Sequence, residues 1–228
     1  MKALAFDLGD TLVEYAGLPL SWESYYPAAL ANLFKSIPVS VSEEQILACA
    51  ALLKEYNTRI VPREIEVGFA EILKRFLAHI EFSGGVDEVR CARAFFSIFR
   101  QRFRAFPDSM PALRAASGRG CRLGIFTDVP YGMPRSLVEE DITLAGLSGA
   151  VDVLLTSVDA GFRKPSPRTL QALALALGSE ANEMSYVGNE RKDIAAALAF
   201  GCEAVLLDRA GQKPDWGQHR TISSLAEL

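Results

Sequence analysis

The sequence has few cysteines, and none of them is arranged as in a disulfide framework or a metal site. Its four cysteines stand singly at Cys49, Cys91, Cys121 and Cys202, without a C-x-x-C pair and without histidines at metal-ligand spacing. A secretory hydrophobic region is missing too, because the chain reaches the charged Asp7 after only four apolar residues. We therefore expect buried free thiols and a cytoplasmic protein.

A membrane-spanning run and a net positive charge are also missing. The uncharged stretch from Ile142 to Val151 contains two glycines and is far shorter than the roughly 20 apolar residues that cross a bilayer. The formal net charge is −4, which provides no basic field for nucleic acid phosphates or an anionic membrane. These absences exclude nucleic acid and membrane as expected partners and favour a small substrate. The oligomeric state cannot be inferred from the sequence.

The length and composition allow a sizeable core. The chain has 228 residues, half of them hydrophobic. It is long enough for one large domain, or for a domain of about 130 residues that carries an insertion of about 90.

The first half, from Ser21 to about Phe106, has helical periodicity, few glycines and no convincing β-rich run. Three amphipathic helices are expected, and a fourth can be accommodated; they should pack as a small bundle. The first begins with S-E-E-Q, which is typical of a capped helix start. The expected helices cover Ser42–Tyr56, Val67–Ile80 and Val86–Phe103.

The second half alternates strands with helices, which predicts a parallel α/β sheet with Rossmann-like winding. The apolar run Ala3–Phe6 belongs to this sheet although the helical segment separates it from the other strands. We expect a core of residues 1–14 and 105–228 and an inserted helical cap of residues 15–104. The other expected strands are Cys121–Thr127, Val151–Ser157, Met184–Val187 and Ala204–Leu207, and the expected helices are Met110–Ser117, one that starts at Ser166-Pro167 and ends at Gly178, and Asp193–Phe200, which Gly201 closes.

Polar residues follow four of these strands. In an open parallel sheet the ligand lies beyond the carboxyl ends of the strands, so these side chains should face one crevice. Carboxylates on two sides of a crevice suit Mg²⁺, which prefers oxygen ligands, while a lysine and a threonine can hold a phosphoryl oxygen. Taken alone, Asp7 could equally cap its own turn. The residues are Asp7 and Asp10 after the first strand, Thr127 and Asp128 after the second, Lys164 after the third, and Asn189, Glu190 and Asp193 after the fourth.

The order and spacing of these groups resemble the haloacid dehalogenase (HAD) superfamily over the whole chain. D-L-G-D-T looks like its first motif, F-T-D its second, Lys164 in G-F-R-K-P-S-P its third, and V-G-N-E-R-K-D-I its fourth. The helical insertion directly after the first motif looks like the cap of subclass I. The resemblance implies a HAD-like fold and a Mg²⁺-dependent phosphatase.

The resemblance also implies roles for single residues. Asp7 would be the nucleophile that forms an aspartyl phosphate, which water then hydrolyses. Mg²⁺ would bind Asp7, the backbone carbonyl of Gly9 and the fourth-motif side chains. Thr127 and Lys164 would donate hydrogen bonds to the phosphoryl oxygens, and Lys164 would also reduce repulsion between Asp7 and phosphate.

The first motif departs from the usual D-x-D pattern. Its second Asp, which protonates the leaving group and later activates water, is here Gly9. General acid–base catalysis is typically worth roughly 10² to 10⁴ in rate. Asp10 could swing in as a substitute because Gly9 is conformationally permissive, or it could simply cap the turn.

The fourth motif departs as well, since Asn189 stands where a metal-binding Asp is common. Asn offers a carbonyl oxygen but no charge, so Glu190 or Asp193 would have to compensate. Asp193 occupies a matching position for a metal ligand; its alternative role is that of an acid at a helix N-terminus.

Two further positions are candidates for substrate binding. Asp128 stands where Asn is frequent in the family, and the V-P-Y-G-M-P that follows is either a loop that contacts substrate or cap, or a simple turn. Arg63 in the cap, together with Arg59 and Glu64, could face the substrate from above, although charged helix residues are usually solvated.

The leading hypothesis is a Mg²⁺-dependent phosphatase of a small phosphorylated metabolite. Its rival is a catalytically impaired HAD-scaffold protein that binds a phosphorylated ligand without efficient turnover, which Gly9 and Asn189 favour. A dehalogenase would not need the acidic fourth motif, and a sugar phosphomutase would need the missing acid.

Overall fold

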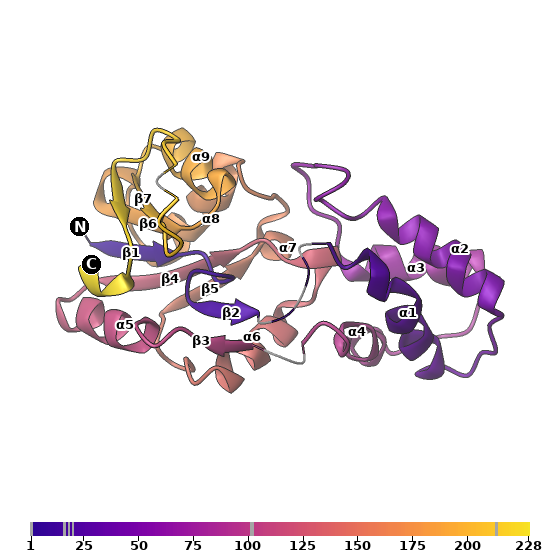
Figure 1. Ribbon diagram of the computed structural model, residues 1–228. Coiled ribbons are helices and arrows are strands. Elements are labelled where there is room, and N and C mark those ends of the chain that lie inside the picture. The colour runs from indigo at the N-terminus through magenta and orange to yellow at the C-terminus, as the bar shows by residue number, and fades with distance from the viewer. Residues whose placement is uncertain (1, 16, 18, 20, 101–102, 213) are drawn as a thin grey trace.

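A six-stranded, entirely parallel sheet forms the larger end of the molecule in the computed structural model, which describes residues 2–15, 17, 19, 21–100, 103–212 and 214–228 (Figure 1). The strand order is β5-β4-β1-β6-β7-β8, so the first strand of the chain lies in the middle, as the sequence predicts for an α/β core. The strands are β1 (Ala3–Phe6), β4 (Arg122–Thr127), β5 (Val153–Thr156), β6 (Met184–Gly188), β7 (Glu203–Leu207) and β8 (Arg220–Ile222).

Helices cover both faces of this sheet, which explains why its central strands are continuous apolar runs. In β1, Leu4 and Phe6 contribute to one hydrophobic cluster, and Ala3 and Ala5 contribute to the other. The second cluster includes α8 and α9, and the first includes α5 and α6, on the opposite side in Figure 1. The helices are α5 (Ser109–Gly118), α6 (Arg135–Leu144), the short α7 (Ser157–Ala160), α8 (Pro167–Leu177) and α9 (Arg191–Phe200).

The predicted helix ends of the core agree with the structure where the sequence carries a capping signal. Pro167 begins α8, and Gly178 ends it with a φ of 65°. Gly201 ends α9 in the same left-handed conformation, with a φ of 87°. Helix α6 and strand β8 are elements that the sequence analysis did not predict.

Four helices lie at the other end of the molecule, away from both termini (Figure 1). Ser42 and Gln45 form the expected capping box at the start of α2. Buried residues of all four helices belong to the same hydrophobic cluster. These helices are α1 (Tyr26–Lys35), α2 (Glu43–Lys54), α3 (Phe69–His79) and α4 (Glu88–Phe96).

The prediction of a helix over Val86–Phe103, without strand structure before Phe106, is wrong at its C-terminal end. Helix α4 ends at Phe96, and the Ser97 hydroxyl donates to the carbonyl of Ala94 at 2.8 Å. Strand β3 (Phe103–Ala105) follows and pairs antiparallel with β2 (Val13–Tyr15). The aromatic spacing that suggested a longer helix instead brings Phe99 against Trp22, with ring centroids 4.2 Å apart.

The expected boundaries 14/15 and 104/105 both fall within the β2–β3 pair. Tyr15 is opposite Phe103 and Val13 is opposite Ala105. The strand by which the chain leaves the sheet region, β2, therefore lies beside the strand by which it returns, β3. The division into a core and an inserted cap stays a prediction.

Candidate active site

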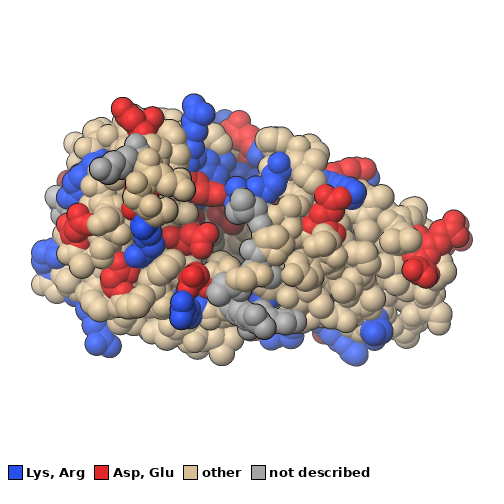
Figure 2. Space-filling view, viewed as in Figure 1, with Lys and Arg blue, Asp and Glu red and all other residues tan. Residues whose placement is uncertain are grey.

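The carboxyl ends of β1, β4 and β6 surround a cavity of about 240 Å³ between the sheet and the four-helix end. Figure 2 shows a hollow at this place with acidic and basic side chains around it. The cavity brings together residues that are far apart in the sequence, as the strand-end argument predicts. Of the predicted site residues, those that line it are Asp7, Gly9, Asp10, Thr127, Asp128 and Asn189.

Lys164 lies behind Asp7, where it is fully buried. Its Nζ donates to Oδ1 of Asp7 at 2.6 Å and to the hydroxyl of Tyr186 at 3.0 Å, and it lies 2.6 Å from Oδ1 of Asp193. The ammonium thus donates two hydrogen bonds, to Asp7 and Tyr186, and forms an ion pair with Asp193. The Tyr186 hydroxyl in turn donates to the carbonyl of Phe126 at 2.9 Å. Lys164 thus connects the ends of β1, β4 and β6.

Asp193 is held at the start of α9 by two backbone donors. Its Oδ2 accepts from the N–H groups of Asn189 at 3.1 Å and Glu190 at 2.8 Å. The end of β6 comes so close that a Cβ on Gly188 would lie 2.4 Å from the Cβ of Asp193, which explains the glycine. Asp193 therefore has the contacts of a helix N-terminal acid, and both of its oxygens are engaged.

Burial and charge oppose one another at the Asp7–Lys164 pair. Burial raises the pKa of Asp7, Lys164 works to lower it, and the nearby Asp193 carboxylate raises it further. For Lys164, burial would lower the pKa, but Asp193 and Asp7 outweigh that effect and hold it well above its usual value. The ammonium therefore stays charged between two carboxylates, and the group of three has a net charge of −1 if both acids are ionised.

The turn after Asp7 places Gly9 and Asp10 at the cavity wall. The backbone N–H of Asp10 donates to the carbonyl of Val13 at 2.7 Å, and Asp10 has a φ of 56°, which Asp tolerates better than most residues. Burial, Glu190 and Glu14 raise the pKa of the Asp10 carboxyl, and Arg59 opposes them. Asp10 thus lines the cavity. Its carboxyl, however, extends from position 10 of the turn, whereas the usual acid of the first motif would extend from position 9.

Asn189 lines the same cavity and accepts a hydrogen bond from the Thr11 hydroxyl at 3.2 Å through Oδ1. The described part of the chain contains no group of three or more His, Cys, Asp or Glu side chains placed to hold a metal ion. The residues that line the cavity near Asp7 instead offer oxygen atoms of mixed kinds, namely carboxylates, backbone carbonyls and an amide.

Asp128 is buried and has cationic or backbone donors as partners. Its Oδ1 accepts from the backbone N–H of Lys164 at 3.1 Å, and its Oδ2 lies 3.3 Å from Nζ of Lys192. These contacts join the end of β4 to the loop that carries Lys164 and to the start of α9. The loop after Asp128 contacts α1, which lies in the segment expected to form the cap, because the hydroxyls of Tyr131 and Tyr26 lie 2.7 Å apart. One interpretation of V-P-Y-G-M-P predicts this contact.

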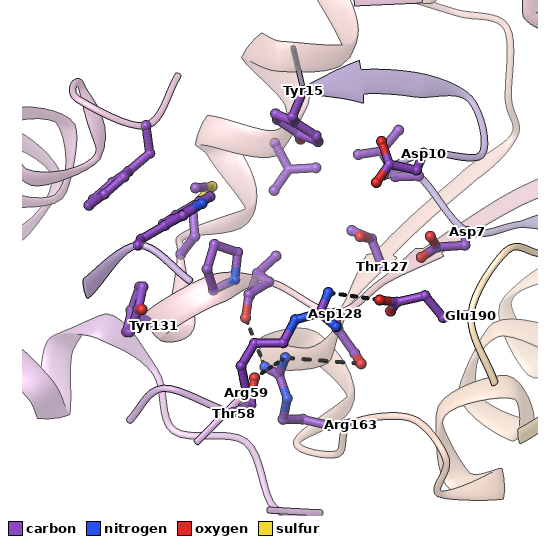
Figure 3. A pocket seen from close by; sticks show the side chains of 18 of the residues that line it. Asp7, Asp10, Tyr15, Thr58, Arg59, Thr127, Asp128, Tyr131, Arg163 and Glu190 are labelled. Carbon is purple, nitrogen blue, oxygen red and sulfur yellow. Dashed lines mark hydrogen bonds and ion pairs between the residues drawn. The ribbon is translucent and has the colours of Figure 1, made fainter. Parts of the chain in front are cut away.

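The structure places Arg63 away from the cavity that Asp7 lines. Its guanidinium donates to the carbonyl of Tyr56 at 2.8 Å and to Glu66 at 3.0 Å, and it faces a neighbouring hollow. Arg59 lines the Asp7 cavity instead, and its guanidinium lies 2.7 Å from a carboxylate oxygen of Glu190 (Figure 3). The loop between α2 and α3 has no helical period from which the direction of either arginine could have been predicted.

Other residues of the cavity were missed by the sequence analysis. Lys192 follows Glu190 within the fourth motif, and its Nζ lies 2.7 Å from the Glu190 carboxylate. Trp22, Phe99 and Tyr131 line the cavity as an aromatic wall. Lys192 could have been found from its place in the motif, whereas Trp22 and Phe99 are separated in sequence and carry no local signal.

The comparisons with known proteins agree with this geometry. Residues 1–201 match the family model of haloacid dehalogenase-like hydrolases, and the chain therefore belongs to that family. The expected HAD resemblance is confirmed.

Individual relatives include phosphatases. A phosphoserine phosphatase of Thermus thermophilus is 31% identical over 94% of this chain and 91% of its own length. A phosphatase of Mycobacterium tuberculosis is 36% identical, but the match spans 55% of this chain and only 56% of that protein. Among solved structures, a 2-haloacid dehalogenase from Pseudomonas syringae has a TM-score of 0.67 at 22% identity and covers all of this chain and 96% of its own. This last likeness supports the fold alone.

None of the described helices is both long enough and apolar enough to cross a membrane.

Proposed function

We propose that this protein is a Mg²⁺-dependent phosphatase that hydrolyses a small phosphorylated metabolite through an aspartyl phosphate on Asp7. The observation that carries the proposal is the contact of 2.6 Å between Lys164 and Asp7 at the wall of a cavity. The phosphatase relatives support the same chemistry. A cytoplasmic location remains part of the proposal.

In the first step, an oxygen of Asp7 attacks phosphorus and the bond from phosphorus to the ester oxygen breaks, so that the leaving group departs as an alkoxide or phenoxide and takes up a proton from water. In the second step, water attacks phosphorus and the bond to Asp7 breaks, which releases inorganic phosphate and restores the carboxylate. Lys164 holds Asp7 in place and reduces its repulsion from the phosphate dianion. Thr127, next to Asp7 in Figure 3, donates a hydrogen bond to a phosphoryl oxygen.

The charges around Asp7 fit a divalent cation. Asp7 and Asp193 share the single ammonium of Lys164, so the negative charge that remains would oppose an incoming phosphate. Asp7, the Gly9 carbonyl and the Asn189 carbonyl would hold the ion, and water would complete its shell. When bound, Mg²⁺ would neutralise charge on the phosphoryl oxygens. Asp193 fits this set poorly as a direct ligand, because its Oδ2 already accepts from the N–H groups of Asn189 and Glu190 and its Oδ1 forms an ion pair with Lys164.

The test is hydrolysis of an aryl phosphate by purified protein. We expect activity with Mg²⁺ that EDTA removes and that Asp7→Asn abolishes. Asp215→Asn is a matched control, since Asp215 is exposed and is not among the described residues that line the cavity. Metal-independent activity, or activity that survives in Asp7→Asn, would contradict the mechanism.

The second candidate is a catalytically impaired protein that binds a phosphorylated ligand. Gly9 favours it, because no acid stands at the position from which the leaving group would receive its proton. If the acid is lost and Asp10 does not replace it, aryl and acyl phosphates should be cleaved far faster than alkyl phosphates, and Asp10→Ala should change little. If aryl and alkyl phosphates are instead hydrolysed at comparable rates, and Asp10→Ala abolishes the hydrolysis, Asp10 supplies the proton. Binding of a phosphate ester without turnover would favour the impaired protein.

A further inference from the structure

We propose that the leaving group of the substrate is a single aromatic ring or a similarly compact apolar group, and that the aromatic wall binds it, with Trp22 and Tyr131 at its surface and the fully buried Phe99 stacked behind Trp22. The proposal rests on the proposed function, because it concerns the same cavity.

The cavity has an aromatic wall away from its nucleophile. The rings of Trp22 and Phe99 are stacked at 4.2 Å with an interplanar angle of 9°, and Tyr131 lies 6.0 Å from Trp22. In Figure 3, Tyr131 and Asp7 are on opposite sides of the cavity. A phosphate bound at Asp7 would therefore direct its leaving group toward the rings. Aromatic pairs of this kind prefer flat apolar partners in offset-stacked or edge-to-face contact.

The ring of Tyr131 is fixed at this wall by strong local constraints. Its φ is 48°, an unusual value for a bulky residue, and such strain clusters at functional sites. The next residue, Gly132, also has a positive φ of 62°, and a Cβ there would lie 2.2 Å from the carbonyl oxygen of Val67. The Tyr131 hydroxyl is paired with Tyr26 at 2.7 Å. The hydroxyl thus already has a partner in the cap, and the ring contributes an apolar surface to the cavity.

The charged side chain closest to this wall in sequence, Arg100, has two of its three nitrogen atoms engaged by Asp141, Glu140 and Leu137. Its Nε donates to Asp141 at 2.7 Å, and a terminal nitrogen donates to the carbonyl of Leu137 at 3.0 Å. Burial would lower the pKa of Arg100, but the contacts with Asp141 and Glu140 outweigh it and raise the pKa. A substrate carboxylate at this end would have to compete with Asp141. This end of the cavity therefore favours an uncharged leaving group.

The size of the cavity and the sequence of the first motif also favour a compact aromatic leaving group. The volume of about 240 Å³ lies below the roughly 300–1,000 Å³ of sites for drug-sized ligands, so the leaving group must be compact. Gly9 supplies no proton, which favours a leaving group that departs as a stabilised anion, such as a phenolate. A ring bound by the aromatic wall would meet both conditions.

The experiment separates ring recognition from leaving-group acidity by comparing benzyl phosphate with ethyl phosphate, because both release primary alkoxides. We expect kcat/KM to be at least about tenfold higher for benzyl phosphate, since even one methylene in an apolar pocket is worth about 10- to 200-fold. Phosphoglycolate, which carries a carboxylate, should also be slower than benzyl phosphate. Equal rates, or a preference for either of the two smaller esters, would overturn the proposal.

Trp22→Ala should reduce the ratio between benzyl and ethyl phosphate toward one. Trp22 is partly exposed, so its truncation should leave the cap folded. Phe82→Ala is the control, because Phe82 is a partly buried cap aromatic that is not among the described lining residues, and it should keep the full ratio. A ratio that Trp22→Ala leaves unchanged would overturn the proposal.

Calorimetry with benzylphosphonate and ethylphosphonate distinguishes this proposal from the proposed function. Tighter binding of benzylphosphonate that Trp22→Ala abolishes, without turnover of any ester, would support ring recognition and contradict the phosphatase activity. Turnover of all esters, with equal binding of the two phosphonates, would support the phosphatase activity and overturn ring recognition.

Discussion

The Nζ atom of Lys164 lies 2.6 Å from Oδ1 of Asp193, and neither side chain is exposed to solvent. The pair connects the start of α9 with the loop before α8, and through Lys164 it reaches Asp7. Removing one partner of a buried ion pair is costly, because the other charge stays buried. The geometry of Asp7, the proposed nucleophile, thus depends on a residue outside the cavity.

Asp193→Asn should lower the free energy of unfolding by about 3 kcal/mol, near the lower end of the range for broken buried pairs because Lys164 keeps Asp7 as a partner. Urea denaturation measures this loss. The rate on an aryl phosphate should fall, while the Mg²⁺ concentration for half-maximal activity should stay the same. A large rise in that concentration would show instead that Asp193 ligates the metal.

Gly9→Asp should restore an acid to the first motif. The backbone of Gly9 lies outside the left-handed region, and a Cβ there would lie 3.5 Å from the Tyr15 ring, an ordinary contact. We expect the rate on an alkyl phosphate to rise by about 10², and the rate on an aryl phosphate to change little. Gly9→Asn is the matched control, since it has the same size but no acidic proton. An equal gain in both variants would exclude general acid catalysis as the cause.

Glu66→Gln should destabilise the junction between the cap helices and the sheet. The Glu66 carboxylate is 1% exposed and pairs with Arg163 and Arg63, and it accepts from the Ser157 hydroxyl at 2.5 Å. Loss of its charge should lower the free energy of unfolding by about 3–5 kcal/mol in a urea titration.

Glu71→Gln is the control for that variant. Glu71 is 61% exposed and lies 3.6 Å from the equally exposed Lys74, so its loss should change the free energy of unfolding by less than about 1 kcal/mol. Equal losses in the two variants would contradict a special role for the buried pair.

Asp108→Asn should remove a contribution of the Asp108 carboxylate to the free energy of unfolding that depends on pH. Partial burial would raise the pKa of Asp108, but hydrogen bonds from Arg209, Ser224 and the Leu225 N–H lower it to about 2. Because the folded pKa is below the unfolded value of 3.8, the carboxylate stabilises the protein above pH 3.8 and loses this effect as the pH falls through about 2.

We expect the Asp108→Asn variant to be less stable at pH 7 by roughly 1 kcal/mol, a value reduced for partial solvent exposure. The difference from the wild type in urea titrations should shrink between pH 4 and pH 2. A difference that stays constant over this range would show that the Asp108 charge is unimportant. Asp215→Asn, at an exposed position, should change the free energy of unfolding at pH 7 by less than about 0.5 kcal/mol.

The sheet could be predicted because its strands are apolar on both faces and end in polar residues. Parallel register then brought Asp7, Thr127 and Asn189 to one cavity without further information. Helix α8 had a proline at its start and a glycine at its end, and both signals were correct.

Contacts that depend on tertiary geometry could not be predicted in the same way. Tyr186 lies inside a strand, so its sequence position resembles that of any core aromatic residue, yet its hydroxyl binds Lys164. Strands β2 and β3 have three residues each, too few for an alternating pattern, and they are stabilised by pairing with one another. Which of Arg59 and Arg63 lines the cavity at Asp7 depends on the path of the loop between α2 and α3.

The β2–β3 pair also has a consequence for how this chain can vary. Tyr15 and Phe103 are opposite one another, with ring centroids 5.9 Å apart, so the long segment between them begins and ends at nearly the same point. A segment of another length could join these two strands at little entropic cost and without moving Asp7 or Lys164. Two of the three aromatic wall residues, Trp22 and Phe99, would be exchanged together with it. If the aromatic wall binds the leaving group as proposed, the β2–β3 pair is a junction at which leaving-group preference can change while the residues around Asp7 stay the same.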